Sequence, residues 1–227
     1  MAARATRGLR EARRAVRVLT FDPVRPESRL PLALLVATTV VLVWSGIRPF
    51  EYPTWILEVF PVLLAIPLLL ITQRRFPFTP MVYTLIAAHA CLLAVGGHYT
   101  YAKVPAGDWF RDWLNLSRNH YDRLGHFAQG FVPAMIAREL LIRLRVVSSA
   151  AWRNFFIVSI CLAISATYEL LEWATALALG EKSDAFLGTQ GDPWDTQMDM
   201  FLAFVGAVAA IAFLGRWHDS QMRRLHS

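Results

Sequence analysis

Three pairs of ionisable residues are the part of this sequence most able to do chemistry. The pairs are Asp122/His126, Glu169/Glu172 and Asp195/Asp199. Residues three or four positions apart share one face of a helix, so each pair presents two functional groups to the same side. All three pairs lie in or beside long apolar blocks. Because ionisable groups are costly at membrane depth and usually mark function there, the pairs predict a polar site inside a membrane.

The donor set combines several carboxylates with an imidazole. Such a set suits Zn, Mn or Fe, whereas oxygen ligands alone would suit Mg. We therefore predict a divalent metal site, with a bound metal activating water and a spare carboxylate acting as general base. The predicted metal ligands are Asp122, His126, Glu169, Glu172 and Asp199. The predicted catalytic residues are Glu172, as the base, with Asp122 and His126.

Two further residues are predicted to bind substrate, namely Arg123 and Asp195. Arg123 lies close enough to the predicted membrane surface to hold a phosphate, as do Arg111 and Arg118. His98, at the end of the third apolar block, could join the site.

Each residue also has a structural interpretation. Asp192 before Pro193 is typical of a helix N-cap, and Asp195 then lies where a capping box has an acid. For the deeper residues the alternative is an internal hydrogen-bonded network that fixes helix register. His89 is predicted to be a packing residue with its hydrogen bonds satisfied, and His218 to be solvated or interfacial.

The elements that must position these residues are membrane helices. Of the 227 residues, 56% are hydrophobic, and they fall in long blocks rather than in a pattern suited to one soluble core. Six blocks are each near the ~20 residues that a bilayer core requires. They are residues 30–47, 54–72, 79–97, 121–142, 154–179 and 194–214. The expected fold is therefore an all-α polytopic membrane protein with six transmembrane helices in one bundle.

The net charge of +6 is distributed by loop rather than along one face, which argues against nucleic acid as a partner. Positive residues concentrate in the leader, at 74–75, between 138 and 153, and in the tail. The alternate loops 48–53, 98–120 and 180–193 hold little of the positive charge. By the positive-inside rule both termini should be cytoplasmic, so the three pairs lie in the outer half of the bilayer.

Outside the bundle the sequence predicts three smaller features. Residues 1–29 form a basic leader, in which 8–20 are either an amphipathic helix on the membrane or a disordered arm. Loop 98–120 is expected to contain a short interfacial helix capped by Asp108, with Trp109 and Trp113 in the headgroup layer. Residues 215–227 are expected to be a cytoplasmic tail.

Three segments carry a resemblance to a known family. They are 121–127 (YDRLGHF), 168–173 (YELLEW) and 191–199 (GDPWDTQMD). These segments resemble the YjdF-like family of bacterial inner-membrane proteins, and the resemblance extends over most of the chain from the second apolar block onward. It implies the membrane topology and the position of the site rather than an activity.

A weaker resemblance is to VanZ-like membrane proteins, whose pattern has Asp-Lys-x-x-His-Phe followed by two further polar helices. Asp122 and His126 match the first part of that pattern, but Glu172 stands where it has glutamine and Asp199 where it has asparagine. The departures make this site more acidic. By analogy alone the resemblance implies a role facing the cell envelope.

Together these features predict a multi-pass protein of the bacterial inner membrane, in contact with membrane lipids. Its carboxylate and histidine site would act on a lipid or cell-envelope precursor as a metal-dependent hydrolase or transferase. Two alternatives stay open. One is a proton- or cation-coupled carrier that uses the same carboxylates as a relay, although no internal repeat of the kind many carriers have is detectable. The other is a non-catalytic scaffold with a structural polar network.

Overall fold

The computed structural model describes residues 29–179 and 189–225, and every regular element within them is helical. The elements are α2 (Leu30–Ser45), α3 (Tyr52–Thr72), α4 (Pro80–Tyr99), η1 (Tyr101–Lys103), α5 (Pro105–Leu114), α6 (Tyr121–Arg143), α7 (Ala150–Leu179) and α9 (Asp195–Arg224). The predicted leader helix at 8–20 lies outside the described residues.

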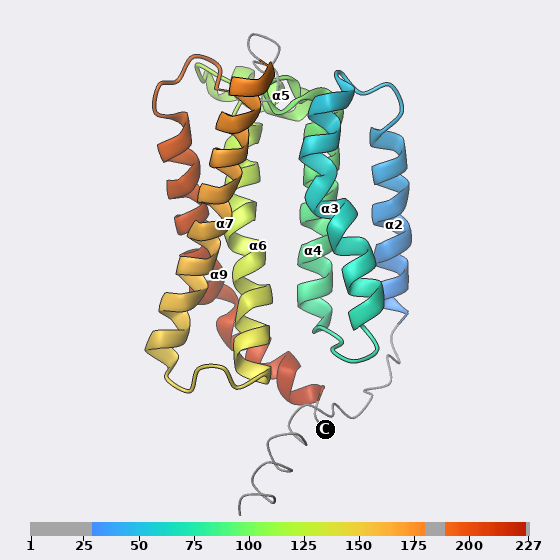
Figure 1. Ribbon diagram of the computed structural model, residues 1–227, viewed down its shortest axis with the longest axis vertical. Helices are drawn as coiled ribbons and strands as arrows, with labels where there is room; N and C mark the ends of the chain where they lie inside the picture. The colour runs from blue at the N-terminus through green and yellow to red at the C-terminus, as the bar shows by residue number, and fades with distance from the viewer. Residues whose placement is uncertain (1–28, 180–188, 226–227) are drawn as a thin grey trace, which may run out of the picture.

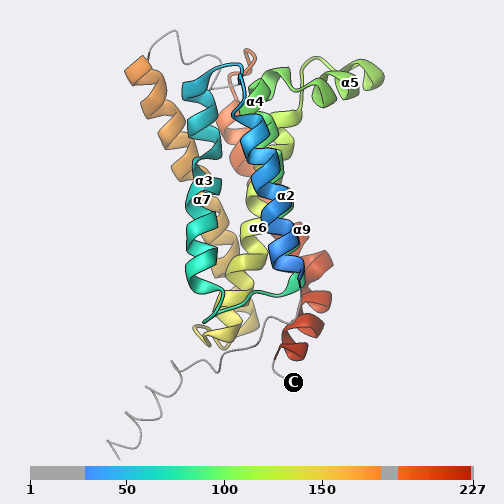
Figure 2. The same cartoon turned by 90° about the vertical axis from the view of Figure 1, so that its right-hand side faces the viewer.

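Six of the helices in the described part of the chain have 16 residues or more, namely α2, α3, α4, α6, α7 and α9. They run up and down in one bundle (Figure 1). Helices α2, α3 and α4 pack together on one side, and α6, α7 and α9 pack together on the other. Helices α4 and α6 join the two groups. The short helix α5 lies across one end of the bundle and projects sideways from it (Figure 2). This end is called the α5 end below.

The bundle has the composition of a membrane protein. Helices α3, α4, α7 and α9 are the four that are long and apolar enough to cross a membrane. Helix α2 is apolar but has only 16 residues, and α6 carries charged residues near both ends. Large apolar side chains point outward from the bundle, among them Leu32, Val40, Ile71, Leu170 and Phe213. Since contiguous exposed apolar surface is rare on soluble monomers, these side chains are suited to face lipid.

The predicted blocks agree with the helices to within four residues at every boundary except one. Helix α9 does not end near 214 but continues to Arg224. Its last turns are polar, yet His218 and Met222 are buried against the rest of the bundle. The prediction that His218 is solvated or interfacial is therefore wrong. The apolar pattern ends before the helix does, because this segment is held by polar contacts instead.

Those polar contacts centre on Glu139, a fully buried residue of α6 at the end opposite α5. Its carboxylate accepts hydrogen bonds from the Thr79 backbone N–H (3.0 Å) and hydroxyl (2.8 Å). It also accepts from Arg143 (2.6 Å) and from His218 Nε2 (2.9 Å). The Nδ1 atom of His218 then accepts from Arg138 at 3.2 Å. One carboxylate thus ties together α6, the start of α4 and the end of α9.

Close packing of α6 on α9 depends on glycine. A Cβ added at Gly130 would collide with the backbone carbonyl of Ala203, and one added at Gly206 would collide with the Phe127 carbonyl. Small residues let membrane helices approach until their backbones touch. This contact lies about one turn from His126 on α6 and from Asp199 on α9, so it sets how near those two side chains come.

The connections at the α5 end differ in detail from the prediction. A short helix is present in loop 98–120, and Trp109 and Trp113 are exposed as expected. Asp108 does not cap it, because the helix begins at Pro105; the Asp108 carboxylate accepts from Arg111 and Asn119 instead. Asp192 is likewise not the cap of α9, which begins three residues later.

Candidate functional site

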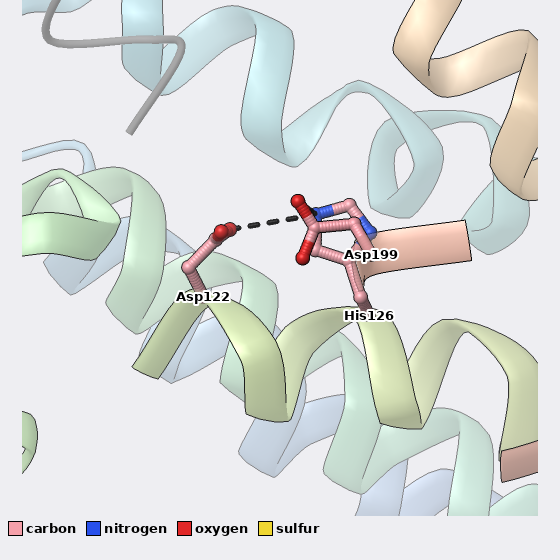
Figure 3. A group of neighbouring side chains, drawn as sticks. All are labelled: Asp122, His126 and Asp199. Carbon is pink, nitrogen blue, oxygen red and sulfur yellow. Dashed lines mark ion pairs between the residues drawn. The ribbon is translucent and has the colours of Figure 1, made fainter. Parts of the chain in front are cut away.

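Helix α6 places an acid and an imidazole one turn apart near the α5 end of the bundle. Asp122 and His126 are both buried, and Asp122 Oδ1 lies 3.5 Å from His126 Nε2. Helix α9 brings Asp199 to the same nitrogen, with Oδ2 at 3.8 Å (Figure 3). The glycine contact between α6 and α9 makes this approach possible.

Helix α7 completes the group from the other side of the ring. Glu169 Oε1 lies 3.8 Å from His126 Nδ1. His126, Glu169 and Glu172 each offer a ligand atom within 4.8 Å of the others. The structure therefore brings five predicted residues together around one imidazole. They are Asp122, His126, Glu169, Glu172 and Asp199, called the His126 cluster below.

The distances inside the His126 cluster are too long for hydrogen bonds but suited to an ion. N–H···O bonds have heavy-atom separations of about 2.7–3.2 Å. Ligand atoms around a tetrahedral zinc ion, each about 2.0–2.2 Å from it, lie about 3.4 Å apart. Asp122, His126 and Asp199 each offer one ligand atom within 4.8 Å of the other two. The cluster could therefore hold a metal ion.

Several buried atoms of the cluster have no hydrogen-bond partner among the described residues. They are Asp122 Oδ2, His126 Nδ1, Glu169 Oε1 and Asp199 Oδ1. Buried polar groups are almost always hydrogen-bonded, because an unsatisfied one costs about 1–3 kcal/mol. The concentration of such atoms at one place contrasts with the contacts of Glu139, whose carboxylate accepts from Thr79, Arg143 and His218.

Arg123 and Asp195 lie beside the cluster, at its α5 end, in an ion-pair network. Arg118 bonds Asp195 at 2.6 Å and lies 3.4 Å from Asp192, while Arg123 bonds Asp192 at 2.9 Å. Arg111 is paired with Asp108 and Asp112. All three arginines predicted to suit a phosphate are thus paired with carboxylates. A phosphate would have to displace Asp192 to reach Arg123.

His120 extends this network. Its Nδ1 accepts from Arg123 at 3.2 Å. Burial and the nearby Arg123 and Arg118 cations lower the pKa of His120 below its usual value of 6.5. The ring is therefore neutral at physiological pH, as an acceptor of a guanidinium hydrogen bond must be.

Glu58 is a residue of the site that sequence reasoning missed. This carboxylate of α3 is buried and accepts a hydrogen bond from the Tyr168 hydroxyl at 3.1 Å. It is also hydrogen-bonded to Tyr101. Burial and the nearby Glu58 raise the pKa of Tyr101 well above its usual value, so the phenol stays protonated. Within its apolar block, Glu58 has no ionisable partner at helical spacing. The one feature of the sequence that could have indicated it is the presence of an acid in an apolar block.

Two other histidines differ from expectation. His98 does not join the His126 cluster: its ring stacks on Trp44, and Nδ1 lies 2.9 Å from the Ser45 carbonyl. His89 was predicted to have its hydrogen bonds satisfied, but among the described residues its buried Nε2 has no partner. Both histidines lie on α4, and of the two only His89 lines the cavity between the two halves of the bundle.

A cavity of about 210 Å³ opens directly below the cluster, between α3 and α4 on one side and α6 and α7 on the other. At its α5 end it is lined by Glu58, Asp122, His126 and Glu172. Farther along, its walls are mainly aliphatic. The His126 cluster therefore lies at the polar end of a largely apolar cavity.

Comparison with known proteins identifies the family. A family model described as "Predicted membrane protein (DUF2238)" matches residues 30–220. The inner membrane protein YjdF of Escherichia coli (strain K12) is 54% identical over 186 residues, which are 82% of this chain and 89% of that protein. No solved structure matches. These matches do not support the resemblance to VanZ-like proteins. The similarity to YjdF and the long apolar helices support a multi-pass protein of the bacterial inner membrane. The chain belongs to the DUF2238 family of predicted membrane proteins.

Proposed function

We propose that this protein binds a divalent metal in the His126 cluster and acts there on a lipid or cell-envelope precursor. The observation that carries the proposal is a set of buried atoms around one ring that have no partner in the described part of the chain. They belong to Asp122, His126, Glu169 and Asp199. Unpaired carboxylates at this depth must bind protons or a cation. Carboxylates combined with imidazole suit Zn, Mn or Fe.

The two nitrogens of His126 divide the ligands into two sets. A neutral imidazole ligates through one nitrogen and keeps its proton on the other. Asp122 and Asp199 face Nε2, whereas Glu169 faces Nδ1. We therefore assign the ion to Asp122, His126 and Asp199. Glu169 Oε1, 3.8 Å from Nδ1, would accept from Nδ1–H after a small approach and hold the ring in place, as carboxylates behind metal-bound histidines commonly do.

Glu172 is left as the general base. It lies within ligand distance of Glu169 and His126 and also lines the cavity, so it faces both the cluster and the space open to a substrate. A metal bound here would supply a Lewis acid and an activated water. Glu172 would accept the proton of that water, and Glu58 with Tyr168 and Tyr101 would close the opposite wall of the site.

Metal analysis of the purified full-length chain tests the ligand assignment. We expect His126→Ala and Asp199→Asn to lower the bound metal at least ten-fold. Glu169→Gln should weaken binding without abolishing it, because a residue that hydrogen-bonds a metal-binding histidine contributes about 10–100-fold to metal affinity. Asp112→Asn, an acid-to-amide change at an exposed position on α5, is the control and should bind metal like the unchanged chain. Absence of metal from every sample, or equal metal in all of them, would remove the assignment.

Lipid profiling tests the role in the envelope. A strain that lacks the gene is complemented with the unchanged chain or with Glu172→Gln, and lipids and envelope precursors are compared. We expect one species to accumulate both without the gene and with Glu172→Gln. If Glu172→Gln restores the normal profile, Glu172 is not the base.

The orientation of the site is part of the proposal. We propose that all six long helices cross the membrane, that both termini are cytoplasmic, and that the His126 cluster opens toward the periplasm. The support is the concentration of arginine in the connections at the end opposite α5.

A carrier that uses the same carboxylates as a proton relay is less well supported. Such a relay needs polar groups through the whole membrane. Among the described residues, the cavity wall beyond the cluster is mainly aliphatic, and Glu139 at the far end is not part of it. Uptake or efflux in proteoliposomes that depends on a pH gradient would favour the carrier over the enzyme.

A further inference from the structure

We infer that the cavity below the His126 cluster binds one acyl chain of a lipid whose phosphate lies at the cluster. This inference rests on the proposed function for the position of the headgroup. It adds the class of substrate, a single-chain acyl lipid, and the route by which that lipid enters.

The cavity has the dimensions of a chain rather than of a compact ligand. It is lined from Asp122 to Ile136 on α6. At 1.5 Å per residue this stretch of helix is about 21 Å long, well over half of a hydrocarbon core of about 30 Å. An apolar cavity of about 150 Å³ holds a molecule of the size of benzene. By the same ratio, a volume of about 210 Å³ drawn out over such a length fits one extended hydrocarbon chain of about eight carbons.

The position of the opening indicates entry from the membrane. Ile164 of α7 lines the cavity and is also 40% exposed on the outer surface of the bundle. One turn nearer the α5 end, the Tyr168–Glu58 hydrogen bond joins α7 to α3 and closes the seam. The cavity thus reaches the bundle surface between α3 and α7, below that bond, where lipid chains surround the protein. A chain can enter sideways while its headgroup stays at the polar end.

Two polar atoms in the wall indicate an ester-linked chain. His89 Nε2 and Gln129 Oε1 are buried, line the cavity and have no hydrogen-bond partner among the described residues. Gln129 lies seven residues after Asp122, which is about 10 Å along the helix. In a lysophospholipid, the hydroxyl and ester lie a few bonds below the phosphate and can reach this depth. A plain isoprenoid chain would leave both atoms unpaired.

The test measures lipid retention by native mass spectrometry on the purified full-length chain in a bulky two-chain detergent. The probes are lysophosphatidylethanolamines with a butanoyl or an octanoyl chain, and geranyl phosphate. We expect one octanoyl lipid per chain, retained at least five-fold better than either other probe. Equal retention of the butanoyl and octanoyl lipids would overturn the chain pocket. Equal retention of geranyl phosphate would overturn the ester linkage.

A matched pair of variants locates the chain. Ala65 lines the cavity about 10 Å along α3 from Glu58, whereas its neighbour Leu64 is exposed on the lipid-facing surface. Ala65→Phe should block the far part of the cavity and lower octanoyl retention at least five-fold while leaving butanoyl retention unchanged. Leu64→Phe should behave like the unchanged chain. Identical behaviour of the two variants would overturn the inference, and retained butanoyl binding shows that Ala65→Phe is folded.

The chain pocket and the metal site can fail separately. Asp199→Asn should lose metal but keep the preference for the octanoyl chain. Ala65→Phe should keep metal and lose that preference. If Asp199→Asn binds metal normally, the proposed function fails while the chain pocket stands. If Ala65→Phe changes no lipid retention, the chain pocket fails while the proposed function stands.

Discussion

Two buried carboxylates of this protein have opposite surroundings. Glu139 receives hydrogen bonds from Thr79, Arg143 and His218, so its charge is fully compensated. One oxygen of Asp199 has no partner within residues 29–179 and 189–225, and the other lies 3.8 Å from an imidazole nitrogen. The first arrangement stabilises a fold, and the second is costly to it. Groups held unsatisfied at the expense of stability are typical of functional sites.

Replacing each acid by its amide should therefore have different effects on stability. Glu139→Gln leaves Arg143 without its buried counterion, and breaking a buried pair in this way costs about 3–5 kcal/mol. Asp199→Asn removes a buried charge that lacks compensation, so the metal-free protein should be as stable as before or more stable. Thermal unfolding in detergent with a chelator present measures both. A larger loss of stability for Asp199→Asn than for Glu139→Gln would contradict the distinction.

For single residues, the sequence predicts contacts made within one helix. Asp122 and His126 could be paired from spacing alone, because a helical turn fixes which side chains share a face. The burial of His218 and the role of Glu58 could not be predicted, because both depend on contacts between helices distant in sequence. Glu139 and Arg143 do have the i,i+4 spacing of an ion pair, so their contact could have been predicted from the sequence.

Among the elements, α6 matters most, because it carries the His126 cluster near one end and Glu139 near the other. Its backbone touches α9 through Gly130 and Gly206. Neither neighbouring backbone can move aside as a flexible side chain would. The separation of α6 and α9, and with it the distance from His126 to Asp199, is fixed by these two glycines.

Gly130→Ala should separate α6 from α9. A methyl group there meets the Ala203 carbonyl, and overpacking of this kind costs about 1–3 kcal/mol. We expect lower thermal stability together with weaker metal binding. Gly215→Ala is the control: it lies on α9, and the nearest atoms to its added methyl are 3.9 Å away on the Arg138 side chain. Equal effects of the two substitutions would show that the close contact does not hold the site together.

Helix positions were predictable from apolar blocks, because a bilayer demands long apolar segments. The end of α9 was not, since beyond 214 the helix is held by Arg138, Glu139 and His218 rather than by apolar burial. The start of α9 lies within one residue of the predicted block, but Asp192 is not its cap. One oxygen of Asp192 accepts from the Trp194 backbone N–H, and the other bonds Arg123 across the bundle.

Over the whole molecule, the two ends of the bundle differ in how the arginines of their connections are balanced by acids. At the α5 end, Arg111, Arg118 and Arg123 are each paired with an aspartate. At the other end, arginines outnumber acids in the connections between helices. Uncompensated arginine is retained on the cytoplasmic side of bacterial membranes. This asymmetry predicts that the His126 cluster faces the periplasm, where an envelope precursor would meet it.

Cysteine labelling in intact cells tests that orientation. The native Cys91 and Cys161 are first replaced by alanine, and a single cysteine is then introduced at Asp112, on α5, or at Ser148, in the connection between α6 and α7. Both positions are exposed. A membrane-impermeant maleimide should label Asp112→Cys in intact cells and Ser148→Cys only after the inner membrane is permeabilised. The reverse pattern would place the cluster on the cytoplasmic side. Its substrate would then be a lipid of the inner leaflet, and the chain cavity, which depends on the bundle alone, would be unaffected.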